Sequence, residues 1–160
     1  MFHIHIPRYE RIWLIAGIST IAVFLILFAV MAVGMGLNPP GHMTMDAIDP
    51  QAVPSTPPFD QPGILQVGPN EYNVSMIARV FAFQPGEINV PAGATVHFQV
   101  TSPDVVHGLI IPGTNVNMMV IPGQVTEFSY TFRKSGEYLI VCHEYCGVGH
   151  HLMAGRVNVQ

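Results

Sequence analysis

The distribution of hydrophobic residues divides this chain into three parts. Residues 12–37 form an uncharged run of 26 residues rich in Ile, Leu, Val, Phe and Ala. At about 1.5 Å rise per residue, such a run would form a helix roughly 39 Å long. Because the hydrocarbon core of a bilayer is about 30 Å thick, the run predicts one transmembrane helix with some tilt.

A cleaved signal peptide is the alternative interpretation of this apolar run. Signal peptides carry shorter apolar stretches, of about 7–15 residues, and a small-residue cleavage site that is not found here. Arg8 and Arg11 precede the run, whereas the next basic residue is Arg79. Since basic residues favour the cytoplasmic side, we expect residues 1–11 in the cytoplasm and residues 38–160 outside the membrane.

Residues 38–69 have a different composition. They contain eight of the 14 prolines, three Asp and no Lys or Arg. Proline restricts φ and cannot donate a hydrogen bond to a neighbouring strand, so the segment is predicted to be an extended, mostly irregular linker. A semi-rigid spacer and a disordered linker are both compatible with this composition.

Short β-rich segments follow the predicted linker. Apolar and polar residues alternate over residues 95–101, and residues 125–132 and 136–141 are rich in β-forming residues. Pro-Gly and Ser-Gly turn signals separate these segments. Residues 70–160 therefore predict an antiparallel β-sandwich or barrel.

Composition narrows the functional classes. With 49% apolar and 10% charged residues, the chain does not have the composition of a disordered protein. A net charge of −4 argues against a nucleic-acid partner, which would require a basic surface. Two cysteines are too few for a disulfide-stabilised scaffold. Nine Met and eight His beside six Lys and Arg draw attention to soft and imidazole metal ligands.

A concentrated group of candidate ligands lies in residues 141–153 (VCHEYCGVGHHLM). Thiolate and thioether ligands select reduced copper, whereas imidazole suits both oxidation states of copper. Gly147 and Gly149 would let the backbone curve around a bound ion. The four candidate ligands lie within twelve residues: Cys142, Cys146, His150 and Met153.

Two alternatives compete with a copper site in this segment. A disulfide between Cys142 and Cys146 would suit an oxidising compartment, but it leaves His150 and Met153 without a role. A zinc site would favour two histidines and have no use for the methionine. Copper accounts for the whole group, so we favour copper and keep the disulfide as the alternative.

A copper site in a β-sandwich typically draws another histidine from an earlier strand. His107 lies in an apolar stretch after the turn at residues 102–104 and is the best distant ligand, although alone it would be a core histidine. His97 shares the polar face of its strand with Thr95 and Gln99, which predicts a solvated side chain. The remaining histidines of this part are expected to face solvent or a partner, or to lie in the linker: His143, His151 and His42.

These motifs resemble a known family. Residues 142–147 (CHEYCG), followed by His150 and Met153, look like the binuclear copper (CuA) motif of cytochrome c oxidase subunit II, and residues 102–108 (SPDVVHG) look like its first-histidine motif. One membrane helix and a compact domain make the chain similar to subunit II of the B-family (ba-type) haem-copper oxidases. The resemblance implies an all-β, cupredoxin-like Greek-key sandwich or barrel over residues 70–160.

The resemblance also implies the ligands of the centre. Two copper ions would be bridged by two thiolates, and each ion would bind one imidazole. A weak axial thioether would complete one ion and a backbone carbonyl the other. The residues that match these ligands are Cys142 and Cys146, His107 and His150, Met153, and the carbonyl of Glu144.

The function implied by the resemblance is electron transfer within a terminal respiratory oxidase. A c-type cytochrome would deliver electrons to the centre, which passes them to haem in subunit I, where O2 is reduced to water with proton pumping. Haem and CuB would belong only to subunit I, so no O2 chemistry is expected on this chain. The expected location is a prokaryotic plasma membrane. The resemblance leaves open whether the oxidase also contains a small additional helical subunit.

Two features depart from the family pattern. Many members have a membrane hairpin and a tryptophan-rich stretch for electron uptake. The only Trp here is Trp13, in the apolar run, and Phe81 and Phe83 occupy the aromatic stretch. From residue 38 onward there are four Lys and Arg against nine Asp and Glu. Two ways of docking the electron donor therefore stay open: acidic residues that steer a basic donor, or an apolar docking patch.

Two acidic residues carry further expectations. In relatives with Cys-x-Glu-x-Cys, the Glu side chain helps hold a magnesium ion at subunit I; this role stays open for Glu144 because B-family members can lack the acid. Glu10 resembles an acid at the mouth of a B-family proton pathway into subunit I. An interfacial anchor paired with Arg11 is an equal alternative for Glu10.

Other functions account for fewer of these residues. A membrane-anchored blue-copper carrier uses one Cys, so it leaves Cys142 unexplained. A copper chaperone with Cys-x3-Cys would place its histidine downstream in a thioredoxin-like fold, whereas His107 lies upstream. A quinol-oxidase subunit II keeps the fold but lacks the copper ligands that are present here.

Overall fold

The computed structural model describes residues 7–35 and 43–160, except for the side chains of Met35 and residues 43–46. The chain divides into two compact units, residues 1–38 and 39–160, which are described separately. His42, residues 1–6 of the predicted cytoplasmic stretch and the last two residues of the predicted transmembrane helix lie outside the described residues.

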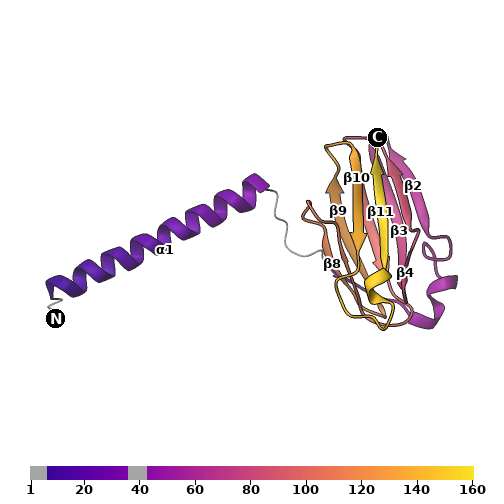
Figure 1. Ribbon diagram of the computed structural model, residues 1–160, viewed down its shortest axis with the longest axis horizontal. Coiled ribbons are helices and arrows are strands. Elements are labelled where there is room, and N and C mark those ends of the chain that lie inside the picture. Colours follow the sequence, from indigo (N-terminus) through magenta and orange to yellow (C-terminus); the bar gives the residue numbers. More distant parts are fainter. Residues whose placement is uncertain (1–6, 36–42) are drawn as a thin grey trace. The chain divides into compact units, whose positions relative to one another are not determined.

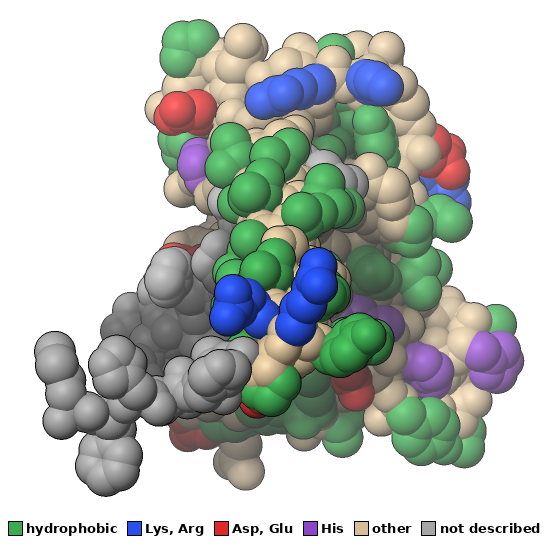
Figure 2. All heavy atoms as spheres, turned by 90° about the vertical axis from the view of Figure 1, so that its left-hand side faces the viewer, with side chains coloured by type: hydrophobic (Ala, Val, Ile, Leu, Met, Phe, Trp, Pro, Cys, Tyr) green, Lys and Arg blue, Asp and Glu red, His purple; other side chains and the backbone are tan. Residues whose placement is uncertain are grey.

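The first unit contains the helix α1 (Arg8–Met35). Its start follows Pro7, whose carbonyl accepts a hydrogen bond from the Arg11 N–H at 3.0 Å. Proline suits a helix start because its missing N–H would have no partner there. No side chain in the apolar span is buried within the chain, and Figure 2 shows hydrophobic side chains exposed along the helix. By length and composition, α1 is able to cross a membrane.

The second unit is a sandwich of two β-sheets (Figure 1). One sheet has the order β1-β9-β6-β3-β2, with β4 also paired to β3, and the other has the order β5-β11-β10-β7-β8. The strands are β1 (Met43–Ala47), β2 (Gly63–Gly68), β3 (Glu71–Arg79), β4 (Ala82–Gln84), β5 (Glu87–Val90), β6 (Thr95–Thr101), β7 (His107–Ile110), β8 (Asn117–Val120), β9 (Gln124–Thr131), β10 (Gly136–Val141) and β11 (Ala154–Val159).

The prediction of an antiparallel sandwich holds for most strand pairs but not for two of them. Most neighbours are antiparallel, but β3 pairs with β6 and β5 pairs with β11 in parallel. Parallel neighbours need a crossover rather than a tight hairpin. The chain supplies one between β3 and β6, because β5 lies in the other sheet and the chain returns from there.

The main core lies between the two sheets. Alternation in β6 places Val96, Phe98 and Val100 in this core, as the sequence predicts. Apolar residues of the facing sheet, such as Ile140 and Val157, complete it. Burial of these side chains is the main source of the domain's stability. Cys142, Cys146 and Met153 belong to the same buried cluster.

The predicted linker is wrong for much of its length. Within residues 38–69, strand β1 pairs with β9, strand β2 pairs with β3, and a 3-10 helix η1 (Pro50–Ser55) lies between them. Asp49 caps η1 by accepting a hydrogen bond from the Gln51 N–H at 3.0 Å. Val53 and Phe59 are buried against Ile77. Proline is compatible with this segment because a short 3-10 helix requires few backbone N–H donors. The segment folds onto the domain because it buries apolar side chains that an exposed linker would leave in water.

Candidate metal centre

The loop between β10 and β11, residues 142–153, carries most of the predicted ligands (Figure 1). Its two ends are joined by a hydrogen bond from the Cys142 N–H to the Met153 carbonyl at 3.2 Å. A one-turn 3-10 helix η2 (His150–Leu152) closes the loop, and the Met153 N–H caps it at the His150 carbonyl. The loop is therefore a compact, hydrogen-bonded structure that places Cys142, Cys146 and Met153 in the buried core.

Two buried thiols form the middle of the site. The Sγ atoms of Cys142 and Cys146 are 3.9 Å apart, and the side chains are 4% and 6% exposed. Both cysteines are free, so this structure does not have the alternative disulfide. The spacing leaves both sulfur atoms available to a bound ion.

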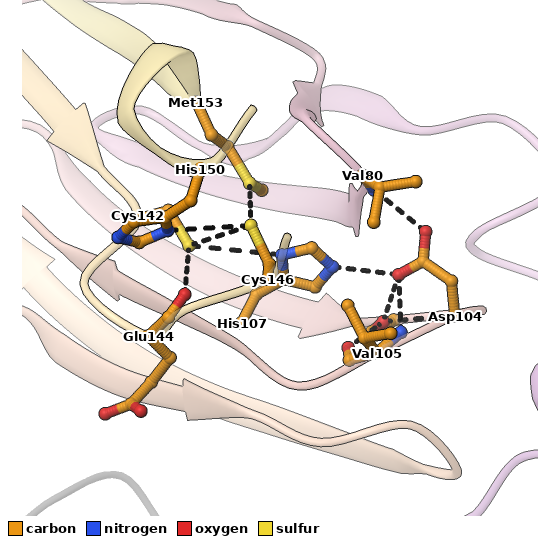
Figure 3. A network of polar contacts seen from close by, with 10 residues as sticks. Val80, Asp104, Val105, His107, Cys142, Glu144, Cys146, His150 and Met153 are labelled. Atoms are coloured by element: carbon orange, nitrogen blue, oxygen red, sulfur yellow. Dashed lines mark hydrogen bonds and ion pairs between the residues drawn. The ribbon is translucent and has the colours of Figure 1, made fainter. Parts of the chain in front are cut away.

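His107 approaches the thiols from the other side of the site, at the start of β7. Its Nε2 donates a hydrogen bond to Asp104 Oδ1 at 2.8 Å. Its Nδ1 lies 3.9 Å from Cys142 Sγ (Figure 3). Because Asp104 accepts the hydrogen bond from Nε2–H, the proton of the neutral ring is on Nε2 and Nδ1 keeps its lone pair toward the sulfur atoms. His107 is completely buried.

Three further donors surround the thiols. His150 Nδ1 lies 3.6 Å and Met153 Sδ lies 3.7 Å from Cys146 Sγ. The carbonyl oxygen of Glu144 lies 3.3 Å from Cys142 Sγ. The six predicted donors therefore converge, and the ligand atoms of His107 and the two cysteines all lie within 4.8 Å of one another.

The Asp104 carboxylate is held by the turn at residues 102–105, and the sequence motif around His107 included this residue without giving it a role. Its Oδ1 accepts the Val105 N–H at 2.7 Å and the Ser102 hydroxyl at 3.1 Å, and its Oδ2 accepts the Val80 N–H at 2.8 Å. Burial acts to raise the pKa of Asp104, but the hydrogen bonds, with that of His107 the strongest, lower it below its ordinary value. An acid three residues before a ligand histidine is the signal that could have identified it.

The Cys146 thiol lies in an environment that resists its ionisation without a cation. Burial, followed by the neighbouring Cys142, raises the pKa of Cys146 to about 11. A coordinated metal ion reverses this effect, because its charge stabilises the thiolate. The donor set combines two thiols, two imidazoles, one thioether and one carbonyl, which is the soft and borderline chemistry that suits copper. The residues therefore fit a copper centre.

The other predicted residues lie outside this group. His97 Nδ1 lies 2.7 Å from the Ser129 hydroxyl. His151 is exposed. The Glu144 carboxylate points away from the sulfur atoms (Figure 3) and lies 3.5 Å from His143 Nδ1. Glu10 is in the first turn of α1 and, within the described part of the chain, forms no ion pair with Arg11.

Comparisons with known proteins agree with this geometry. A family model described as the periplasmic domain of cytochrome c oxidase subunit II matches residues 77–159. A cytochrome c oxidase subunit 2 of Thermus thermophilus is 40% identical over 162 residues, which cover 99% of this chain and 95% of that protein. A second Thermus thermophilus sequence of the same name is 43% identical over 127 residues, covering 78% of this chain and 93% of that protein.

Two solved structures are also similar. A chain of a haem-copper terminal oxidase dimer, determined by cryo-electron microscopy, has a TM-score of 0.76 and 36% identity, and the match covers 96% of this chain and 100% of that chain. The periplasmic domain of cytochrome oxidase subunit II from Bradyrhizobium japonicum has a TM-score of 0.51 at 22% identity, over 55% of this chain and 83% of that chain. The second match supports the fold alone, which is cupredoxin-like, as predicted.

Proposed function

Because this chain belongs to the cytochrome c oxidase subunit II family, we propose that its β domain holds a binuclear copper centre that receives electrons for a membrane-bound terminal oxidase. Members of this family are subunits of an oxidoreductase. The similarity to the Thermus thermophilus relatives is consistent with the B-family type of oxidase. The convergence of two buried thiols with two imidazole Nδ1 atoms carries the proposal.

Each part of the ligand set has a separate task in this proposal. Cys142 and Cys146 would hold two copper ions through their thiolates, and His107 and His150 would add one imidazole to each. Met153 and the Glu144 carbonyl would add weaker ligands. When bound, the copper pair supplies a one-electron redox couple shared between two metal ions. A mononuclear blue-copper site would require only one of the two adjacent thiols.

The protein contributes rigidity and orientation. Asp104 fixes the ring of His107 through its Nε2–H, and the hydrogen-bonded loop fixes the other donors. The thiols lie in the packed core between two sheets, which limits rearrangement around them. Ligands that keep one arrangement in both oxidation states favour fast electron transfer, because little reorganisation is then needed.

We further propose the path of the electrons. A c-type cytochrome donates to the centre, and haem in subunit I receives the electrons, with O2 reduction and proton pumping in subunit I. The loop of residues 142–153, here called the copper loop, carries three apolar or aromatic residues that are 73–85% exposed: Tyr145, Val148 and Leu152. Their exposure supports docking of the cytochrome near the centre. Large apolar side chains that are exposed on one short loop are a feature of protein interaction sites.

The membrane arrangement is also a proposal. Helix α1 anchors the chain in a prokaryotic plasma membrane, with Arg8 and Arg11 on the cytoplasmic side. The β domain then lies on the periplasmic or extracellular side. A proton-pathway role for Glu10, magnesium binding by the Glu144 side chain and a small helical partner subunit stay predictions.

Copper stoichiometry and electron paramagnetic resonance (EPR) of the full-length chain in detergent test the proposal. We expect two copper ions per chain and a signal split by both nuclei. His97→Ala serves as a matched control, because His97 bonds Ser129 outside the site, and it should leave the signal unchanged. One copper ion per chain with a mononuclear signal would overturn the binuclear proposal in favour of a blue-copper centre.

A further inference from the structure

The ligands of the proposed centre come from two separate segments. One segment, residues 102–107, supplies His107 together with Asp104, and the other is the copper loop, residues 142–153. The hairpin turn between β3 and β4 contacts both segments. This turn is fixed at its base, since Arg79 pairs with Ala82 and Ala78 pairs with Phe83 across the hairpin.

A backbone hydrogen bond joins the turn to the first segment. The Val80 N–H donates to Asp104 Oδ2 at 2.8 Å, while Asp104 Oδ1 accepts from His107 Nε2 at 2.8 Å (Figure 3). The two oxygens of one carboxylate therefore connect the turn to a copper ligand. Any shift of Val80 that lengthens this bond would remove the restraint on Oδ2 and let the carboxylate that orients His107 rotate about its other hydrogen bonds.

An aromatic ring joins the turn to the second segment. The ring of Phe81 lies against two glycines of the copper loop, Gly147 and Gly149. A Cβ placed on Gly149 would lie 2.6 Å from the ring, and one placed on Gly147 would lie 3.0 Å from it. Gly149 directly precedes His150 and is the N-cap residue of η2. The ring can therefore reach the loop backbone only because neither residue has a side chain.

We propose that the β3–β4 turn positions both halves of the copper site, with Val80 acting through Asp104 on His107 and Phe81 acting through the loop glycines on His150. This inference rests on the proposed function. The turn limits the distance between the two ligand segments before metal arrives, so its loss weakens copper binding and alters the electronic structure of the centre. Val80 and Phe81 are positioning residues, because neither supplies a ligand atom.

Phe81→Leu tests the aromatic contact in the full-length chain in detergent. We expect roughly tenfold weaker copper binding in a chelator competition, as is typical when a residue that supports a metal ligand is lost. We also expect a changed EPR hyperfine pattern. In the metal-free chain, the His150 N–H, which donates to the Gly147 carbonyl at 3.0 Å, should exchange with solvent faster.

Phe83→Leu is the matched control for a merely structural effect. Phe83 lies two residues further along and is buried in the main core. Its substitution should lower thermal stability while leaving copper affinity within about twofold and the EPR pattern unchanged. Equal effects of the two substitutions on copper affinity, EPR pattern and His150 exchange would overturn the inference.

A pair of compensating substitutions sharpens the test. Gly149→Ala should weaken copper binding by more than Phe81→Leu, because the new Cβ meets the ring. Combining the two should restore part of the affinity, since Leu leaves room for the methyl group. Absence of recovery in the double variant would contradict the ring contact. If Gly149→Ala does not fold, the Phe81→Leu and Phe83→Leu pair decides.

These outcomes separate this inference from the proposed function. A wild-type chain that binds no copper pair would refute the function itself. A wild-type chain with the two-copper signal, accompanied by indistinguishable Phe81→Leu and Phe83→Leu variants, would refute only the positioning role of the turn.

Discussion

Two separate clusters in the β domain bury apolar side chains, but they differ in the atoms that they contain. The main core lies between the two sheets and includes Cys142, Cys146 and Met153. The smaller cluster lies apart from it and consists of Val53, Phe59 and Ile77, with only hydrocarbon side chains buried. Burial stabilises both clusters, but only the main core contains atoms that can bind a metal.

The difference shows how a core can serve two purposes. In the smaller cluster, each side chain contributes through the area it removes from water. In the main core, the same burial raises the pKa of the Cys146 thiol and excludes solvent from His107. Substitutions in the smaller cluster should therefore change stability alone, whereas substitutions at Cys142, Cys146 or Met153 in the main core should change copper binding.

The largest expected effect comes from replacing one of the two buried thiols. Cys146→Ser should abolish the two-copper centre, because a hydroxyl is a poor copper ligand. The domain should remain folded, since serine differs from cysteine by one atom. Metal analysis and circular dichroism of the full-length chain measure the two properties. A variant that still binds two copper ions would contradict the ligand role proposed for Cys146.

The next effect concerns the smaller cluster. Phe59→Ala removes a ring that is 2% exposed, and losses of this kind are about 3 kcal/mol or more in free energy of unfolding. Copper affinity should not change, because the cluster contains no ligand. Denaturant titration and chelator competition test the two statements, with Phe59→Leu as a milder control. Weaker copper binding in Phe59→Ala would show that the two regions are coupled.

A smaller effect is expected at the edge of the metal site. Asp104→Asn keeps the size of the side chain but removes the charge that orients His107. Copper affinity should fall by roughly tenfold, or about 1.4 kcal/mol. Asp60→Asn is the matched control, since Asp60 is exposed. Equal affinities of the two variants would contradict the role of Asp104.

The smallest effect belongs to neither cluster. Glu137 and Arg156 form an exposed ion pair at 3.6 Å, with side chains 56% and 52% exposed. Glu137→Gln should change the free energy of unfolding by less than about 0.5 kcal/mol, because solvent screens exposed charges. The change should vanish at high salt. A salt-independent loss above 1 kcal/mol would show that this surface contributes to stability like a core.

Local sequence patterns predicted much of the architecture. The apolar run predicted α1, and alternation predicted β6 and its buried face. The Pro-rich segment was misjudged, because its prolines indicate irregular structure while its few apolar residues find their partners only on the outer face of a sheet formed by distant strands. Val53 and Phe59 pack on Ile77, and no local pattern identifies that partner.

By itself, the sequence determined the ligand types and their local spacing. Cys142, Cys146, His150 and Met153 lie within one loop, so a short stretch of chain specifies their proximity. The apolar stretch around His107 indicated it as the distant ligand, the family resemblance added the carbonyl of Glu144, and the comparisons confirmed the family.

Only the tertiary structure decided which groups support those ligands. His107 and Cys142 are 35 residues apart, and Val80 and Asp104 are 24 residues apart. Such contacts depend on how the chain passes from one sheet to the other, because these connections bring distant turns to one end of the sandwich. Residue periodicity reports which face a strand buries, but it carries no information about which distant turn will meet that face.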